Sequence, residues 1–338
     1  MEPFKNVFNE DLVQGMAEHF ARHGSEFDRE EFCQFVLKDL NQLELKERSN
    51  KIVEAMAVYL PGDFKTSAKI LEASLHPDPP DDLYGITVSA KGLAGWAIMP
   101  MGEYVGQNGL EHFDLSLKLL KAMTSRFTSE SAIRHFFLKD HKKTLKTIKP
   151  WTQDRNRHVR RLVSEGSRPL LPWSPRIGAF VDDPLLILPL LELLRHDKEE
   201  YVRRSVANNL NDIAKHHPDL VAETATLWLQ GASKDEQRMV RHACRTLLKQ
   251  GHPGTLSAFG YGDVKLDVEA FDIENPAIKL GQQLTFDLTL KSTSNEPQPL
   301  MIDYIVHHRK ANGTTSPKVF KWKTLTLKPG EEMVARKK

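Results

Sequence analysis

Carboxylates and basic side chains occur together at helical spacing in the middle of the chain. Arg161 and Glu165 are four residues apart, and Arg204, Asn208 and Asp212 follow one another at steps of four. Residues three or four apart share one face of a helix, so each set should form a stripe of neighbours. A lone Arg161–Glu165 pair could be an ordinary surface ion pair, worth on the order of a few tenths of a kcal/mol. Two stripes inside a basic region indicate a further task, because a surface that only held phosphates would gain nothing from carboxylates that repel them.

These stripes belong to a phrase that occurs three times: Asp, four residues, then Val-Arg and a third basic residue. The copies read Asp154…Val159-Arg160-Arg161, Asp197…Val202-Arg203-Arg204 and Asp235…Val240-Arg241-His242, and they begin 43 and 38 residues apart. A helical repeat with a period near 40 is typical of HEAT-type helix pairs stacked into a solenoid. With each Val turned to the core, we expect the third basic residue to lie on another face and the stripes to line the concave surface.

The elements that must position these residues are helices, followed by strands. Helical periodicity runs from residue 6 to about 254, with breakers at Pro61-Gly62, Pro150, Pro172 and Pro184. After Gly262 the pattern becomes alternating, over 264–273, 284–290, 300–306 and 318–327, with a possible fifth strand at 332–335. Such alternation predicts a small immunoglobulin-like β-sandwich, although that fold needs about seven strands, so the last strands are expected to be missing. We therefore expect a mostly α protein, with a HEAT-like α-solenoid at 1–258 and an immunoglobulin-like sandwich at 259–338.

Composition places the chain among ordinary soluble proteins. Of its 338 residues, 40% are hydrophobic and 27% charged. The two cysteines, Cys33 and Cys244, could form at most one disulfide, too few to stabilise a chain of this length. Both are expected to be buried as small hydrophobic residues in a reducing cytoplasm. The N-terminus lacks the order of a signal peptide, and no apolar run approaches the roughly 20 residues that span a bilayer. No membrane partner is expected.

The charge is unevenly placed. Residues 134–180 contain 12 Lys or Arg against 3 Asp or Glu, whereas residues 1–63 contain 7 against 13. This asymmetry predicts a surface for a polyanion in the middle of the chain, with a plain solvated face as the alternative, above all for the three lysines at 142, 143 and 146. The candidate DNA contacts are Arg157, Arg160, Arg161, Arg204, Asn208, Arg241, Lys142, Lys143 and Lys146.

Two phrases carry a resemblance to a known family. One is Glu165-Gly166-Ser167-Arg168-Pro169-Leu170-Leu171-Pro172-Trp173, and the other is Val206-Ala207-Asn208-Asn209-Leu210-Asn211-Asp212. Together they closely resemble the AlkC branch of the bacterial DNA alkylation-repair glycosylases, and the resemblance covers nearly the whole chain. It implies a monofunctional glycosylase that acts as a monomer, without a cofactor or metal, on double-stranded DNA containing 3-methyladenine or 3-methylcytosine and without flipping the base into a pocket. The functional set that it implies is Glu130, Arg161, Glu165, Trp173 and Asp212.

The implied chemistry explains the mixture of charges. A base methylated at N3 is a cation, so it leaves as a neutral molecule and needs no general acid. The enzyme needs anionic groups beside the oxocarbenium-like sugar and one group that orients water. Glu165 and Asp212 suit the first task, and Trp173 offers a π face to a cation. Arg161 is expected to hold the phosphate of the damaged nucleotide.

Each of these assignments has an alternative. Glu130, in Thr128-Ser129-Glu130-Ser131, could be a first-turn carboxylate favoured by a helix dipole. Trp173 could be a core tryptophan, although two nearby prolines and Glu165 argue for a site residue. No phosphate-binding loop, dinucleotide-binding fingerprint, catalytic triad or metal-ligand spacing is found. A non-catalytic HEAT scaffold that binds nucleic acid or an acidic protein is the competing function.

Overall fold

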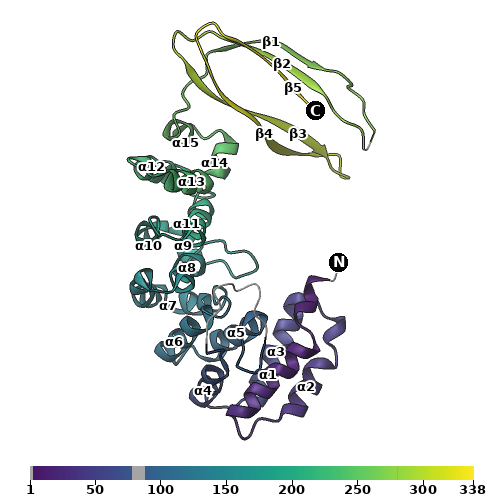
Figure 1. Ribbon diagram of the computed structural model, residues 1–338, viewed down its shortest axis with the longest axis vertical. Coiled ribbons are helices and arrows are strands. Elements are labelled where there is room, and N and C mark those ends of the chain that lie inside the picture. The colour runs from purple at the N-terminus through teal and green to yellow at the C-terminus, as the bar shows by residue number, and fades with distance from the viewer. Residues whose placement is uncertain (1–2, 78–87, 280) are drawn as a thin grey trace. The chain divides into compact units, whose positions relative to one another are not determined.

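The computed structural model describes residues 3–77, 88–279 and 281–338, in which two compact units, 1–216 and 217–338, are distinguished (Figure 1). In the described residues of the first unit the regular elements are helices, and two isolated β-bridges, Leu75–Leu93 and Ser89–Gly92, are present. Its elements are η1 (Phe4–Val7), α1 (Glu10–His23), α2 (Arg29–Leu37), η2 (Leu40–Gln42), α3 (Leu45–Tyr59), α4 (Phe64–Ser74), η3 (Gly95–Ala97), α5 (Ile98–Asn108), α6 (Phe113–Thr124), α7 (Ile133–Ile148), η4 (Lys149–Gln153), α8 (Arg157–Gly166), α9 (Gly178–Asp182), η5 (Pro184–Leu186), α10 (Leu188–Leu194) and α11 (Glu200–Ile213).

Local signals explain where these helices begin and end. The side chains of Asn9, Asp28 and Asp63 cap α1, α2 and α4 by accepting hydrogen bonds from backbone N–H groups of the first turn. Pro61-Gly62 separates α3 from α4, as predicted. Asp140 has non-helical backbone angles inside α7 and its side chain accepts from Lys143 N, so α7 is two helical segments joined at a kink.

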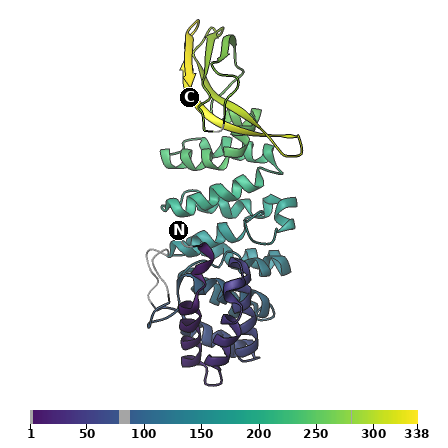
Figure 2. The same ribbon diagram turned by 90° about the vertical axis from the view of Figure 1, so that its right-hand side faces the viewer.

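The repeated phrase turns one valine of each copy inward. Val159, Val202 and Val240 are all buried, as predicted. The Asp of the first two copies caps the turn that precedes the helix, since Asp154 Oδ1 accepts from Asn156 N and Asp197 Oδ1 from Glu199 N. Helices α8 and α11, which follow these turns, pack directly against each other in the stack of helix layers seen in Figure 2.

Arg160 has a structural role, which corrects its expected place among the DNA contacts. Its guanidinium binds Asp197 of the next repeat at 2.5 and 3.0 Å and donates to the carbonyl oxygen of Asp154 at 2.9 Å. Only 8% of its side chain is exposed. Arg203, at the same position of the second copy, likewise donates to the carbonyl oxygen of Asp197 at 2.6 Å. In the first two copies, the arginine after the valine therefore fastens the turn that precedes its own helix.

The second unit begins with four helices: α12 (Pro218–Leu229), α13 (Lys234–Ala243), α14 (Arg245–Gln250) and α15 (Pro253–Ala258). A capping box formed by Ser233 and Glu236 starts α13. The last helix ends at Ala258, four residues after the expected end of the helical pattern near residue 254. Over the described residues, no helix is long and apolar enough to cross a membrane.

The strands that follow form two small antiparallel sheets. Strands β1 (Leu266–Ile273), β2 (Phe286–Ser292) and β5 (Glu332–Lys337) form one sheet in the order β1-β2-β5, and β3 (Gln298–Arg309) pairs with β4 (Thr315–Leu327) in the other. The two sheets share one apolar core, made by Leu290, Leu300, Leu327, Met333 and Ala335. The four predicted strands and the possible fifth are confirmed, and the sandwich is immunoglobulin-like.

Candidate active site

The candidate site lies on two packed helices and on the loop that follows the first of them. Helix α8 begins at the Asn156 cap, whose side chain accepts from His158 N at 2.8 Å. It ends at Gly166, where a Cβ atom would lie 2.6 Å from Cγ2 of Ile133, so glycine lets the end of α8 pack closely on α7. Glu165 is therefore fixed between α7 and α11.

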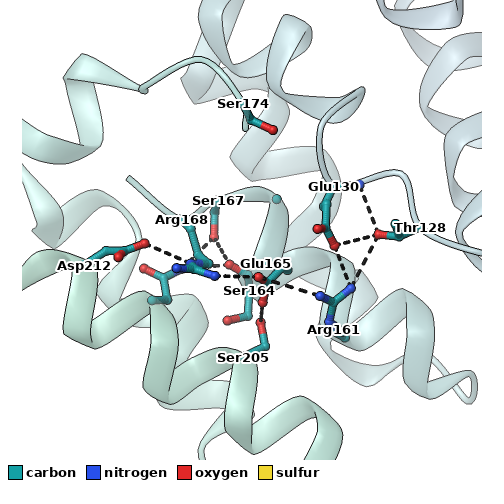
Figure 3. A network of polar contacts seen from close by, with 12 residues as sticks. Thr128, Glu130, Arg161, Ser164, Glu165, Ser167, Arg168, Ser174, Ser205 and Asp212 are labelled. Atoms are coloured by element: carbon teal, nitrogen blue, oxygen red, sulfur yellow. Dashed lines mark hydrogen bonds and ion pairs between the residues drawn. The ribbon is translucent and has the colours of Figure 1, made fainter. Parts of the chain in front are cut away.

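Glu165 is buried and has both carboxylate oxygens occupied. Its Oε1 accepts from Arg168 Nη1 at 2.7 Å and lies 3.7 Å from Arg161 Nη2, while its Oε2 accepts from Ser205 Oγ at 2.6 Å. The residue is 5% exposed. The predicted contact between Arg161 and Glu165 is confirmed, but it is one part of a larger network (Figure 3).

Arg168 connects Glu165 to Asp212. Its Nε donates to Asp212 Oδ2 at 2.9 Å, and Asp212 Oδ1 accepts from Lys215 at 3.3 Å. Asp212 itself is 2% exposed. On α11 the predicted stripe thus runs from exposed Arg204 through half-buried Asn208 to buried Asp212. Figure 3 shows Asp212 and Glu165 on either side of the Arg168 guanidinium, so the two carboxylates belong to one site.

Glu130 joins the other end of the network through Arg161. Arg161 Nη1 donates to Glu130 Oε2 at 2.7 Å, and the same oxygen accepts from Thr128 Oγ1 at 2.7 Å. Glu130 lies in the turn before α7, and 22% of its side chain is exposed, which makes it the most accessible of the three carboxylates. The Arg161 guanidinium also lies 4.9 Å from the ring centre of Tyr201. The direct contacts of the network therefore alternate carboxylate and guanidinium, from Glu130 to Asp212.

The neighbouring arginines favour the ionised form of Glu165. Burial opposes the charge of Glu165, but Arg161, Arg168 and the hydrogen bond from Ser205 outweigh it, so the pKa of Glu165 is lowered. Burial also opposes the charge of Arg161, and here Glu130 and Glu165 prevail and raise its pKa. The same holds for Arg168, whose pKa Asp212 and Glu165 raise against its burial. Two guanidiniums bridge the three carboxylates and Lys215 also contacts Asp212, so three cations face three anions within the network.

Trp173 lies on the Trp loop, residues 167–177, which connects α8 to α9. It is the only non-glycine residue in the described part of the chain with a positive φ, 63°, and it is 69% exposed. Left-handed backbone at a non-glycine residue is unfavourable and marks functional or strained positions. Trp173 is therefore not a core tryptophan, and its ring is available to a ligand.

The predicted DNA contacts fall into different surroundings. Arg161 is 18% exposed and holds Glu130 and Glu165, whereas Arg204 is 65% exposed and Arg157 39%. Lys142, Lys143 and Lys146 are exposed on α7 after its kink. In the second unit, Arg241 lies against Phe259, 5.4 Å from the ring centre. Their contact with phosphate, and a concave surface lined by them, stay predictions.

Among the residues that contact the carboxylates or the Trp loop, four that were not foreseen as functional are Arg168, Ser205, Lys46, which donates to the carbonyl oxygen of Trp173, and Arg134, which donates to that of Arg168. Arg168 is three residues from Glu165, a spacing that could have indicated it. The other three come from α3, α7 and α11, and their approach depends on packing between helices, which periodicity does not reveal. In the described ranges, no group of three or more His, Cys, Asp or Glu side chains is arranged to hold a metal ion.

The comparisons with known proteins agree with this fold. Residues 106–247 match the family described as "DNA alkylation repair enzyme", and residues 267–338 match the C-terminal Ig-like domain of the uncharacterised protein YhaZ. YhaZ of Bacillus subtilis (strain 168) is 35% identical over 98% of this chain and 88% of its own length. Among solved structures, the Pseudomonas fluorescens alkylpurine DNA glycosylase AlkC, bound to DNA containing an abasic site analog, is 33% identical. It covers 99% of this chain and 90% of its own, with a TM-score of 0.87.

A HEAT-like helical region followed by an immunoglobulin-like domain defines a DNA alkylation repair fold. The chain belongs to the AlkC-type family of DNA alkylation repair enzymes.

Proposed function

We propose that this protein is a monofunctional DNA glycosylase that removes cationic N3-methylated bases, 3-methyladenine and 3-methylcytosine, from double-stranded DNA. The observation that carries the proposal is the placing of Glu130, Glu165 and Asp212 in one arginine-bridged network beside an exposed tryptophan. Family membership supports the same reaction class.

The reaction requires stabilisation of positive charge. The N-glycosidic bond between C1′ and the base breaks, and its electron pair moves to the cationic base, which leaves neutral. The sugar becomes oxocarbenium-like, water attacks C1′, and one proton is lost from that water. Fixed anionic groups stabilise such a sugar without reorganising, and each can contribute about 3–4 kcal/mol, by analogy with a single oxyanion-hole donor. No residue has to protonate the base, so excision needs no pocket into which the base must move.

The three carboxylates suit different tasks. Glu165 and Asp212 are buried, and both carboxylate oxygens of each accept hydrogen bonds, so these residues would stabilise the cationic sugar electrostatically rather than by accepting a proton. Glu130 is more exposed, and it is suited to accept the proton of the attacking water. Trp173 presents its π face to the cationic base or sugar, a contact worth about 0.5–2 kcal/mol. Arg161 fixes Glu130 and Glu165 and, in this proposal, also approaches the phosphate of the damaged nucleotide.

Exposed basic residues would bind the DNA backbone, and each real phosphate contact should steepen the log–log salt dependence by about 0.9. The proposed DNA contacts are Arg157, Arg204, Asn208, Arg241, Lys142, Lys143 and Lys146. Arg160 is left out because it is buried in an ion pair with Asp197. That the AlkC of P. fluorescens was solved bound to DNA supports a DNA partner. We propose that the protein acts as a monomer in the bacterial cytoplasm, with water as the only other reactant.

The test is incubation of the protein with DNA methylated at N3 positions, followed by measurement of released bases and abasic sites. We expect release by the wild type and about a 100-fold or greater loss with Glu130→Gln or Asp212→Asn, at unchanged or raised DNA affinity. A scaffold that only binds nucleic acid would release nothing above a heat-inactivated control, and that result would reject the proposal.

A further inference from the structure

We infer that Arg134 is a positioning residue that sets the place of Trp173, an inference that rests on the proposed glycosylase function. Arg134 is the second residue of α7 and has no exposed surface. It lies one turn of sequence after Glu130, but its guanidinium points at the Trp loop instead of joining the carboxylate network directly.

Arg134 uses all of its donors on the backbone that carries Trp173. Its Nη1 donates to the carbonyl oxygens of Gly166 at 3.1 Å and Arg168 at 2.6 Å. Its Nη2 donates to Pro169 O at 3.4 Å and to Pro175 O, and its Nε donates to Pro175 O at 2.8 Å. A guanidinium has five N–H donors in a fixed plane, so these five bonds saturate it. One rigid group thereby holds the loop both before and after Trp173.

The place of Trp173 depends on how the backbone of the Trp loop is anchored. Its ring is 69% exposed, so core packing does not hold the side chain in place. Its positive φ is an unfavourable backbone state that persists only where the surroundings impose it. Two further contacts fasten the same segment: Ser174 Oγ lies 2.7 Å from Ser131 Oγ, and Lys46 donates to the carbonyl oxygen of Trp173 itself.

The geometry also favours arginine specifically. A lysine would bring the same charge but only three donors from a single atom, and it could not span carbonyls on both sides of the loop. Burial, followed by repulsion from Arg168, lowers the pKa of Arg134 to about 10, so the group is still protonated at neutral pH. It is thus a buried cation retained for its hydrogen bonds to the loop.

A matched control is available in the same unit. Arg48 is 3% exposed and its guanidinium also donates to backbone carbonyls, of Leu43 at 3.1 Å and Phe8 at 2.9 Å, neither of which belongs to the Trp loop. Arg134→Met and Arg48→Met remove equivalent buried guanidiniums. Both should lower the melting temperature, but only Arg134→Met should change the Trp loop.

The experiment combines hydrogen exchange with single-turnover excision of 3-methyladenine from DNA at saturating enzyme. Arg134→Met should increase amide exchange in residues 166–177 and slow excision by about 2- to 30-fold, no more than Trp173→Ala does, with the Kd for DNA unchanged. Added to Trp173→Ala, Arg134→Met should cause no further loss, because both act through one ring. Arg48→Met should change neither quantity. If Arg134→Met does not fold, Arg134→Lys is measured in the same way and should show the same pattern at smaller amplitude.

The inference is overturned if the two substitutions multiply their effects, if loop exchange is unchanged, or if Trp173→Ala leaves excision at the wild-type rate. The first and the third of these results require that the wild type excises the base. Absence of excision by the wild type would instead reject the proposed function, and unchanged loop exchange in Arg134→Met would still be decisive for the anchoring role.

Discussion

At the scale of single residues, Glu165 shows how the site combines burial with charge. Its carboxylate receives hydrogen bonds from Arg168 and Ser205 and lies beside Arg161. Arg161 lies on the same helix, α8, Arg168 follows the end of that helix, and Ser205 belongs to α11. An ionised carboxylate in such surroundings is stabilised only while its partners remain in place. The proposed electrostatic role of Glu165 and the stability of the first unit therefore depend on the same contacts.

The lowered pKa of Glu165 predicts a pH-dependent contribution to stability. An unfolded glutamate titrates near about 4.3, so the contribution is fully present above that pH and is lost as the pH falls through the lower folded pKa. Glu165→Gln should reduce the free energy of unfolding by about 1.5–3 kcal/mol at pH 7, and the difference from wild type should shrink below about pH 4. Denaturant titrations from pH 3.5 to 7 measure this. A difference that grows on acidification would contradict the ionised state.

Trp173 allows a prediction in which activity and stability separate. Because its ring is exposed, Trp173→Ala should leave the melting temperature unchanged while slowing excision by about 2- to 30-fold. Trp173→Phe retains a π face and should slow excision less. Thermal melts and single-turnover rates decide this, and a fall in melting temperature without loss of rate would show that Trp173 is structural.

Sequence reasoning located the acidic members of the site but missed several of their partners. The spacing of four residues on one helix predicts a contact between Arg161 and Glu165, and the prolines around Trp173 suggest that its side chain is exposed on a loop. Arg134 and Ser205 meet the site only because α7 and α11 pack on α8, and no local pattern encodes that contact. Arg160 was misjudged because, by sequence, its charge cannot be distinguished from that of its neighbour Arg161.

At the scale of elements, the repeated phrase has two separate roles on one helix. In the first two copies the arginine after the valine reaches back to its own turn, as Arg160 and Arg203 do, whereas the next residue pairs with a carboxylate, Arg161 with Glu130 and Arg204 with Glu200. Arg160 also binds Asp197, so the first repeat is fastened to the second by a buried ion pair. The period of about 40 residues predicted the helix pairs, and the burial of Val159, Val202 and Val240 confirms which face they turn inward.

This division predicts opposite phenotypes for Arg160 and Arg204. Arg160→Met leaves Asp197 buried without its partner and should cost about 3–5 kcal/mol of stability, with no change in the salt dependence of DNA binding. Arg204→Ala, at an exposed position, should leave stability within about 0.5 kcal/mol and, if Arg204 contacts phosphate, reduce the log–log salt slope by about 0.9. Denaturant unfolding measures the stability of each variant, and DNA binding at several salt concentrations measures the salt slope. A stable Arg160→Met with a reduced salt slope, together with a destabilised Arg204→Ala, would contradict the structure.

At the scale of the whole molecule, the chain combines a helical repeat region with a five-stranded immunoglobulin-like domain. Each part could be predicted from its own periodicity, 3.6 residues in one and two in the other. The charge asymmetry along the sequence pointed to a polyanion, but it could not separate cations in buried ion pairs, such as Arg161 and Arg168, from those open to DNA. That distinction needs the three-dimensional packing.

The most direct measurement is the release of 3-methyladenine from methylated double-stranded DNA by the wild type and by Asp212→Asn, compared at equal DNA occupancy. Anionic groups held within an arginine network should make the wild type release the base and leave abasic sites, and loss of one charge should slow release by about 100-fold or more without weakening binding. Near-normal release by Asp212→Asn, or none by a wild type that binds the same DNA, would contradict the central claim.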